Sequence, residues 1–292
     1  YLYDHLDKDL LEIDMINFSG PDFKLVDNRL MSLQLIKNDM TDAVMFDPSG
    51  VNLLPAAVLY KKNIMAIRGS FRPVTLVNED MFQKSLDMFL HESTVDPNNT
   101  IVLFEITLSN LKVSGEIDER DFLDRAELLC ALGHTVLISK FQEYYKLVEY
   151  FNEYTKARIG LSMGVNNLVA IFDEKYYDNL PGGLLEAFGR GFGHNVKLYI
   201  YPAINVEDGS LYHLGNIKLP ENLIGLLNYM QANDKITALQ EYDTSLLHIL
   251  SDDVLSKIKA NAHSWEDDVP YEVVKAIKFF ELFGFQQKLD KH

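Results

Sequence analysis

Short apolar runs alternate with longer segments of helical spacing along most of the chain. A continuous apolar run of about four to eight residues, bounded by turn residues, is typical of a strand buried on both faces of a parallel sheet. Such runs occupy residues 42–47, 63–68, 100–108, 135–139, 159–165 and 196–201. Apolar positions at helical spacing occupy residues 81–90, 117–132, 142–156 and 184–192. This alternation predicts strands joined by right-handed helical crossovers.

The predicted fold class is therefore α/β, with a doubly wound, mainly parallel sheet. Its core is expected to span residues 42–205. Residues 1–41 have few periodic apolar positions and are expected to form a peripheral lead-in, whereas residues 206–292 are expected to form a mainly helical C-terminal extension. Helical spacing in that extension covers residues 223–230, 245–260 and 271–283. Because the chain starts with Tyr1 rather than Met, we expect it to continue upstream into a longer protein.

Two helix boundaries are marked by particular residues. Asn78 or Glu79 is expected to begin the helix at residues 81–90, because short polar and acidic side chains are favoured at helix starts. Gly133 is expected to end the helix at residues 117–132, since glycine readily adopts the left-handed conformation that closes many helices.

The charge balance limits the classes of partner. Of 292 residues, 27 are Lys or Arg and 43 are Asp or Glu, which gives a formal net charge of −16. Nucleic acid is not expected as a partner, because binding its phosphates requires a basic surface. A small phosphorylated molecule or a nucleotide is compatible with this charge, since it needs one local cluster of donors.

The apolar content and the single cysteine indicate the environment of the protein. Apolar residues make up 47% of the chain, which is enough for a packed core. No run reaches the roughly 18 apolar residues of a transmembrane helix, so no membrane is expected as a partner. The charged first ten residues are not expected to be a signal peptide. Cys130 is expected to be a buried thiol. A reducing, cytoplasmic setting fits this composition.

The histidines do not predict a metal site. They stand at positions 5, 91, 134, 194, 213, 248, 263 and 292, and no two have the i, i+4 spacing of a helical zinc site. His134 precedes the apolar run at 135–139, at the end of a parallel sheet opposite to where catalysis takes place.

The most distinctive segment joins the apolar run at 63–68 to the helix at 81–90. Ligands of doubly wound sheets bind beyond the carboxyl ends of the strands, where loops lead into helices. This loop combines a glycine, which permits close backbone approach, with neutral donors and two cations: Gly69, Ser70, Thr75, Asn78, Arg68 and Arg72. Free amides and the helix dipole favour an anion there. The alternative is a tight turn with surface arginines.

Residues 69–78 resemble a family signature. They read Gly-Ser-Phe-Arg-Pro-Val-Thr-Leu-Val-Asn. This is similar to Gly-Ser/Thr-Phe-x-Pro-Ile/Val-His/Thr-x-Gly-His, the signature of the nucleotidyltransferase superfamily that includes nicotinate- and nicotinamide-mononucleotide adenylyltransferases. The resemblance covers about residues 63–202, through Phe104–Asn110, Leu137–Ser139 and Asp173–Tyr177. The chain also looks like bacterial proteins labelled nicotinate-nucleotide adenylyltransferase.

The resemblance implies a Rossmann-like nucleotidyltransferase fold and a reaction. The reaction would be adenylyl transfer from ATP, with Mg²⁺, to nicotinate mononucleotide or another phosphate-bearing acceptor, as in NAD biosynthesis. Thr75 and Asn78 hold the positions of the family's two histidines, which contact the triphosphate, and they are the implied catalytic residues. The implied nucleotide-binding residues are Arg68, Gly69, Ser70, Phe71, Arg72, Ser139, Gly164 and Asn166.

Departures from the family pattern support a second hypothesis. Asn78 can donate a hydrogen bond but carries no charge, and Val77 replaces a glycine beside the phosphates. The family's second motif, Ile-Ser-x-Ser/Thr-x-x-Arg, is absent, and Glu221 at about its place has the wrong charge for phosphate. The chain could instead be a catalytically degenerate relative that binds a nucleotide or a protein partner. Residues 162–167 would equally serve as a plain strand exit with Asn helix caps.

Overall fold

The computed structural model describes residues 13–286 except residues 114, 194, 206 and 207. Its centre is an eight-stranded sheet in the order β12-β9-β8-β3-β4-β7-β1-β2. The pairs from β12 to β7 are parallel, while β1 and β2 are antiparallel to their neighbours at one edge. The strands are β1 (Ala43–Phe46), β2 (Asn52–Leu53), β3 (Asn63–Arg68), β4 (Thr100–Thr107), β7 (Thr135–Ser139), β8 (Ile159–Gly164), β9 (Val196–Tyr201) and β12 (Ile236–Ala238).

Two short hairpins and several 3-10 turns lie outside the main sheet. The hairpins pair β5 (Lys112–Val113) with β6 (Glu116–Ile117) and β10 (Ala203–Ile204) with β11 (Leu211–Tyr212). The 3-10 turns are η1 (Pro21–Phe23), η2 (Pro97–Asn99), η3 (Glu174–Tyr177), η4 (Thr244–Leu246), η5 (His263–Asp268) and η6 (Leu282–Gly284).

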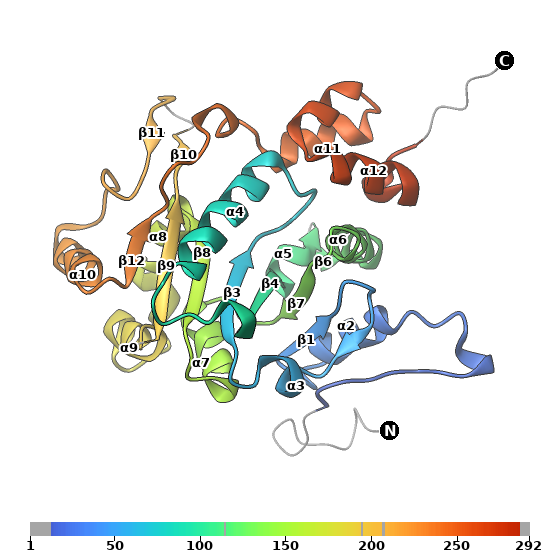
Figure 1. The fold of residues 1–292 in the computed structure, drawn as a ribbon, viewed down its shortest axis with the longest axis horizontal. Helices are drawn as coiled ribbons and strands as arrows, with labels where there is room; N and C mark the ends of the chain where they lie inside the picture. The colour runs from blue at the N-terminus through green and yellow to red at the C-terminus, as the bar shows by residue number, and fades with distance from the viewer. Residues whose placement is uncertain (1–12, 114, 194, 206–207, 287–292) are drawn as a thin grey trace.

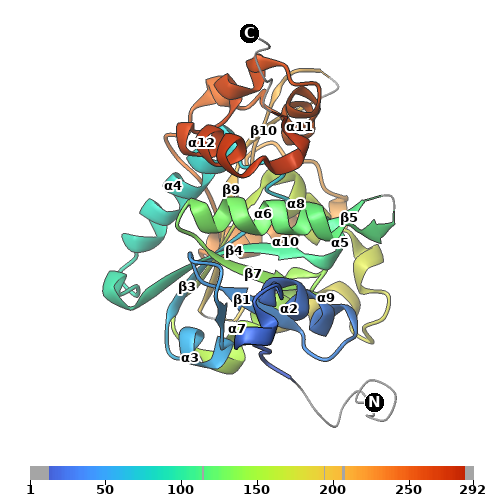
Figure 2. The same ribbon diagram turned by 90° about the vertical axis from the view of Figure 1, so that its right-hand side faces the viewer.

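Helices cover both faces of the sheet, as Figures 1 and 2 show. On one face the core is built with α2 (Asn28–Lys37), α4 (Leu76–Leu90), α6 (Glu119–Ala131), α11 (Ser251–Lys259) and α12 (Tyr271–Phe280). On the other it is built with α3 (Pro55–Leu59), α7 (Tyr144–Tyr154), α8 (Val165–Ile171), α9 (Gly183–Gly191) and α10 (Glu221–Ala232). The short helix α5 (Leu108–Leu111) directly follows β4.

Alternate side chains of the central strand β3 belong to the cores on opposite faces of the sheet. Ile64 and Ala66 belong to one core, and Met65 and Ile67 belong to the other. Successive side chains of a strand point to opposite faces, so a strand covered on both sides needs apolar residues at every position. This is why the inner strands appear in the sequence as uninterrupted apolar runs.

Gly160 on β8 marks a close approach between the sheet and α4. A Cβ atom at this position would lie 2.7 Å from Cδ2 of Phe89 and 2.8 Å from Sδ of Met65. Because both neighbours are fully buried, we expect Gly160→Ala to destabilise the fold by about 1–2 kcal/mol through overpacking. Gly225→Ala is the matched control, since a Cβ there meets nothing within 4 Å.

Urea unfolding of both variants checks this expectation. In α10, where Gly225 lies, alanine is favoured over glycine by roughly 0.5–1 kcal/mol, so the control should be neutral or stabilised. Equal stability of the Gly160→Ala variant and the native protein would contradict the close approach.

The predicted doubly wound, mainly parallel α/β sheet with a helical C-terminal extension is confirmed. All six apolar runs form strands of the main sheet, and Gly133 ends α6 with the expected left-handed conformation at φ 84°. Cys130 is buried, and burial raises the pKa of its thiol to about 11. No helix in the described part of the chain is long and apolar enough to cross a membrane.

The structure differs from the expectations in four places. The strand β1 is antiparallel, since an apolar run carries no information about strand direction. The extension adds β12 to the sheet beside β9. The helix expected at 245–260 is split into η4 and α11, because Leu247 and Ile249 turn into the core between them. Finally, α4 begins at Leu76, with Thr75 rather than Asn78 or Glu79 as its N-cap.

Candidate functional site

A cavity of about 480 Å³ lies where β3, β4, β7 and β8 end. From β3 the chain proceeds to β4 and β7 on one side, and later to β8 and β9 on the other, so the winding direction reverses at β3. Such a switch point is where open α/β sheets bind ligands. The cavity is lined by Arg68, Gly69, Ser70, Thr107, Ser109, Asn110, Gln142, Glu143, Tyr144, Asn167, Ala170, Ile171, Tyr176 and Tyr177.

The loop between β3 and α4 is shaped by Phe71. A Cβ atom on Gly69 would come within 2.9 Å of two carbon atoms of the Phe71 ring. That ring is buried, 5.2 Å from the Phe104 ring between centroids, and the Phe71 backbone has φ 47°. Gly69 therefore gives room for Phe71 to enter the core, which is a packing reason for a glycine at this position.

Arg68 is neutralised by a buried carboxylate. Its Nε and Nη2 donate to the two oxygens of Glu105 at 2.6 and 2.7 Å, and its Nη1 donates to the Gln142 carbonyl at 2.9 Å. Burial, the largest single influence, lowers the pKa of this guanidinium, but the charge and the hydrogen bonds of Glu105, with smaller contributions from Tyr144 and Glu143, together raise it. The ring of Tyr144 lies 4.2 Å from the guanidinium carbon. Arg68 forms part of the cavity wall as one half of an ion pair.

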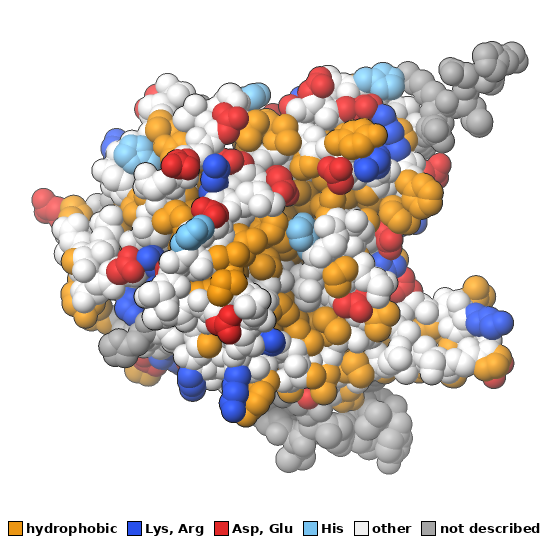
Figure 3. Space-filling view, in the orientation of Figure 1, with side chains coloured by type: hydrophobic (Ala, Val, Ile, Leu, Met, Phe, Trp, Pro, Cys, Tyr) orange, Lys and Arg blue, Asp and Glu red, His pale blue; other side chains and the backbone are white. Residues whose placement is uncertain are grey.

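Arg72 is also paired with a carboxylate. Its Nε donates to Asp121 at 2.5 Å, and Asp121 also pairs with Arg125. Each of the two loop arginines therefore has a carboxylate partner from another strand or helix, but Arg72 shares its partner with a second guanidinium. On the face shown in Figure 3, acidic and basic side chains are interspersed, and basic side chains do not form a continuous area.

Thr75 and Asn78 form the start of α4 together. The Thr75 backbone N–H and hydroxyl donate to Oδ1 of Asn78 at 3.0 and 3.1 Å. This reciprocal arrangement is a capping box, which satisfies donors that a helix start would otherwise leave without partners. Thr75 is buried, and neither residue lines the cavity. Because the oxygen of Asn78 is engaged, its amide group keeps both hydrogens for donation.

The remaining predicted residues lie apart from the cavity. Ser139 is fully buried, and its hydroxyl donates to Oε1 of Glu105 at 2.6 Å. It therefore helps to hold the carboxylate that pairs with Arg68. Gly164 ends β8 and is the N-cap of α8, in place of the expected Asn cap. Asn166 is exposed and borders a separate cavity of about 560 Å³. Of the ten predicted site residues, the structure brings Arg68, Gly69 and Ser70 to the cavity wall.

Several cavity residues were not predicted as site residues. They come from the carboxyl ends of β4 and β8 and from the start of α7: Thr107, Ser109, Asn110, Gln142, Tyr144 and Asn167. Ligands of doubly wound sheets bind beyond the carboxyl ends of the strands, and this rule predicted the Arg68 loop as a site. Applied to the end of β4, the same rule predicts Thr107 and Asn110. No sequence signal distinguishes Tyr144 from the other tyrosines of its helix.

The cavity wall is polar but close to neutral. Arg68 pairs with Glu105, and Glu143 pairs with Lys146 at 2.9 Å. Burial raises the pKa of Tyr144 to about 12, although Arg68 lowers it, so the phenol stays uncharged at neutral pH. Hydroxyls, amides and phenol rings are the groups that hold a flat or polyhydroxylated ligand by stacking and hydrogen bonding. Within the described residues, no cluster of three or more His, Cys, Asp or Glu side chains is arranged to hold a metal ion.

Among known proteins, solved structures resemble this chain, whereas sequence comparisons find no match. No protein-family model matches the sequence, and no curated protein matches it significantly. A solved structure of Plasmodium falciparum nicotinic acid mononucleotide adenylyltransferase, complexed with APC, is similar at 14% identity with a TM-score of 0.46, covering 77% of this chain and 98% of that one. A Vibrio parahaemolyticus protein with a provisional assignment as a nicotinate-nucleotide adenylyltransferase is similar at 13% identity with a TM-score of 0.32, covering 76% and 95%. Values this low do not carry a function from those proteins to this chain.

Proposed function

We propose that this protein binds a nucleotide, or a related small phosphorylated molecule, in the cavity at the carboxyl ends of β3, β4 and β8. The observation that carries the proposal is the position of the cavity at the switch point of the sheet, bordered by the β3–α4 loop. The hydroxyl, amide and phenol groups of the wall suit a sugar and a flat base. The 15-residue helix α4 follows the same loop, and its dipole favours a phosphate near its start, although its first residues do not line the cavity.

A second candidate function is adenylyl transfer from ATP and Mg²⁺ to nicotinate mononucleotide or another phosphate-bearing acceptor. The observation that favours it is the capping box, which fixes Asn78 with its amide group as a donor at the start of α4. Preorganised donors at a phosphate account for much of the rate of such transfers. The ion pairs of Arg68 and Arg72 weigh against it, because each guanidinium already has a carboxylate partner, although Arg72 shares Asp121 with Arg125.

Two neighbouring asparagines of α8 allow a matched test of the binding site. Asn167 lines the cavity, whereas Asn166 is next to it in the chain and borders a different one. We expect Asn167→Ala to weaken nucleotide binding about five- to tenfold, the value of about one hydrogen bond, and Asn166→Ala to leave the affinity unchanged. Titration calorimetry with ATP and with nicotinate mononucleotide measures both.

The outcomes separate the candidates. If Asn166→Ala weakens binding and Asn167→Ala does not, the ligand binds outside the proposed cavity. Absence of binding for every nucleotide and sugar phosphate tried would overturn the proposal itself. Pyrophosphate release from ATP, Mg²⁺ and nicotinate mononucleotide would establish the second candidate, and binding without turnover across several acceptors would exclude it.

A further inference from the structure

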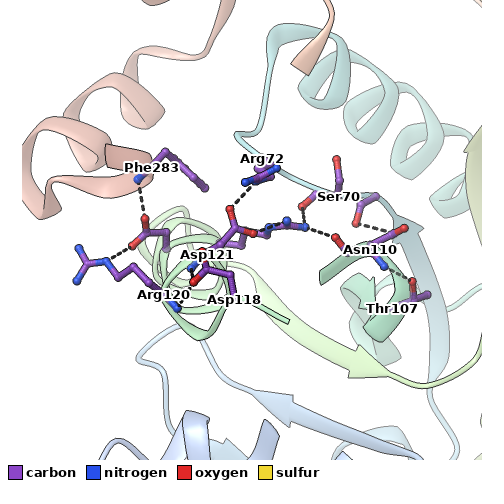
Figure 4. Close-up of polar contacts among 11 residues, drawn as sticks. Ser70, Arg72, Thr107, Asn110, Asp118, Arg120, Asp121 and Phe283 are labelled. Carbon is purple, nitrogen blue, oxygen red and sulfur yellow. Dashed lines mark hydrogen bonds and ion pairs between the residues drawn. The ribbon is translucent and has the colours of Figure 1, made fainter. Parts of the chain in front are cut away.

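Two segments of the cavity wall, the β3–α4 loop and the short helix α5, are held by the same helix. Figure 4 shows α6 between the C-terminal segment on one side and the β3–α4 loop and α5 on the other. In Figure 2 the same helix lies between the sheet and the helices α11 and α12. Polar side chains on successive turns of α6 make the contacts in both directions, so the helix connects the C-terminal extension to the cavity.

Arg125 on α6 makes the contact with both segments. Its side chain is 1% exposed, and its Nη1 donates to the carbonyl oxygens of Ser70 at 3.1 Å and of Asn110 at 2.8 Å. Ser70 and Asn110 both line the cavity. One planar group thus fixes a loop and a short helix that follow different strands. A lysine would keep the charge but would lack the rigid fork of donors.

Asp121, one turn earlier on α6, holds this arrangement in place. It accepts hydrogen bonds from Nη2 of Arg125 and, at 2.5 Å, from Nε of Arg72. Arg72 follows Ser70 by two residues in the same loop. The β3–α4 loop is therefore bound to α6 through a side chain and through a backbone carbonyl, which limits its movement at two points.

Asp124, beside Arg125 in the sequence, binds the C-terminal segment. Its Oδ2 accepts a hydrogen bond from the Phe283 backbone N–H at 2.6 Å, and its Oδ1 forms an ion pair with Nε of Arg120 at 3.0 Å. Leu282 and Phe283 are buried against the same core as α6. The carboxylate of Asp124 is 6% exposed, so loss of the Phe283 N–H would leave a nearly buried acceptor with one partner fewer.

We propose that α6 couples the docking of residues 282–285 to the shape of the cavity, with Arg125 as the positioning residue. The inference rests on the proposed function, because it concerns control of the same site. Release of Phe283 from Asp124 would loosen the turn of α6 that carries Arg125. The carbonyls of Ser70 and Asn110 would then lose their fixed donor, and a ligand that needs both segments in place would bind less tightly. By thermodynamic linkage, the bound ligand would also strengthen the docking of the segment.

Hydrogen exchange resolved by residue tests the coupling without any ligand. The reporters are the amides of Gly69, which donates to the Glu105 carbonyl, and of Asn110, which donates to the Thr107 hydroxyl. We expect Asp124→Ala to accelerate exchange at Phe283 and at both reporters by about tenfold or more. The amide of Ile64 in β3 is the internal reference and should keep its rate. Arg120→Ala is the matched control, because it removes the ion pair of Asp124 and keeps the Phe283 contact.

Affinity measurements complete the test. Arg125→Lys should accelerate exchange at Gly69 and Asn110 and should weaken nucleotide binding by about tenfold, and saturating nucleotide should slow exchange at Phe283 in the native protein. Faster exchange confined to residues 282–285 in Asp124→Ala would overturn the coupling, even if nucleotide binds. Coupled exchange without nucleotide binding would retain the coupling and overturn the proposed function. If Arg125→Lys does not fold, the exchange rates of Gly69 and Asn110 in Asp124→Ala still test the coupling, because this variant keeps Arg125.

Discussion

Replacing Glu105 by alanine is expected to destabilise the protein by about 3–5 kcal/mol, the usual effect of leaving one partner of a buried ion pair alone. Glu105 is fully buried and accepts hydrogen bonds from Nε and Nη2 of Arg68 and from the Ser139 hydroxyl, at 2.6, 2.7 and 2.6 Å. Removal of the Glu105 carboxylate leaves the Arg68 side chain, which is only 8% exposed, with no counter-charge. Arg68 cannot lose its proton to relieve this, because the pKa of arginine is too high.

Urea unfolding of Glu105→Ala, with Glu149→Ala as control, measures this effect. Glu149 pairs with Arg190 at 2.6 Å, but both side chains are more than a third exposed, so we expect a loss of less than about 1 kcal/mol. The double variant Arg68→Met with Glu105→Leu should be more stable than Glu105→Leu alone, since it removes the unpaired charge. A Glu105→Ala variant no less stable than the control would contradict the buried pair.

The second large expected effect is a loss of stability in mild acid caused by His134. Its ring stacks on the Phe104 ring at 3.9 Å between centroids, and the Phe82 ring meets it edge-on at 5.4 Å. Burial lowers the pKa of His134 from 6.5 to about 4. Between these values the unfolded chain binds a proton at this histidine and the folded protein does not. The contribution of His134 is therefore complete above about pH 6.5 and is lost as pH falls toward 4.

The size of this contribution is about 2–3 kcal/mol, allowing for the partial exposure of the ring. Unfolding free energies measured from pH 4 to pH 8 give the slope for the native protein and for His134→Gln, whose side chain does not titrate. The difference between the two slopes isolates His134 from carboxyl groups that titrate in the same range. Parallel slopes would show that His134 protonates as readily in the folded protein as in the unfolded chain.

The sequence was sufficient to predict the layout of the fold, because buried parallel strands have a distinctive pattern. The run at residues 63–68, for example, coincides with β3 residue by residue. Strand direction could not be predicted for β1, since its four buried residues would look the same in either orientation. The three-residue strand β12 is too short for any periodicity to reveal it.

The position of the site in the chain could be predicted from the sequence, but the ion pairs of its arginines could not. The strand-end rule identified the loop of Gly69 and Ser70, which does border the cavity. The partners of the two arginines stand 37 and 49 positions away, at Glu105 and Asp121. Nothing in a sequence pattern indicates pairs at such separations. The role of Thr75 and Asn78 was accessible, because a Thr followed three residues later by an amide side chain is close to the capping-box pattern.

The two cores also differ in how much of the chain they need during synthesis. The core with α7, α8 and α10 is built from residues 43 to 236, whereas the core with α4 and α6 extends from residue 33 to residue 283. On a ribosome, the first core has all its residues before α11 and α12 are made, while the second still lacks these helices. The face of α6 that receives Phe283 is therefore uncovered until residues 282–285 have emerged, so a nascent chain exposes this face to chaperones.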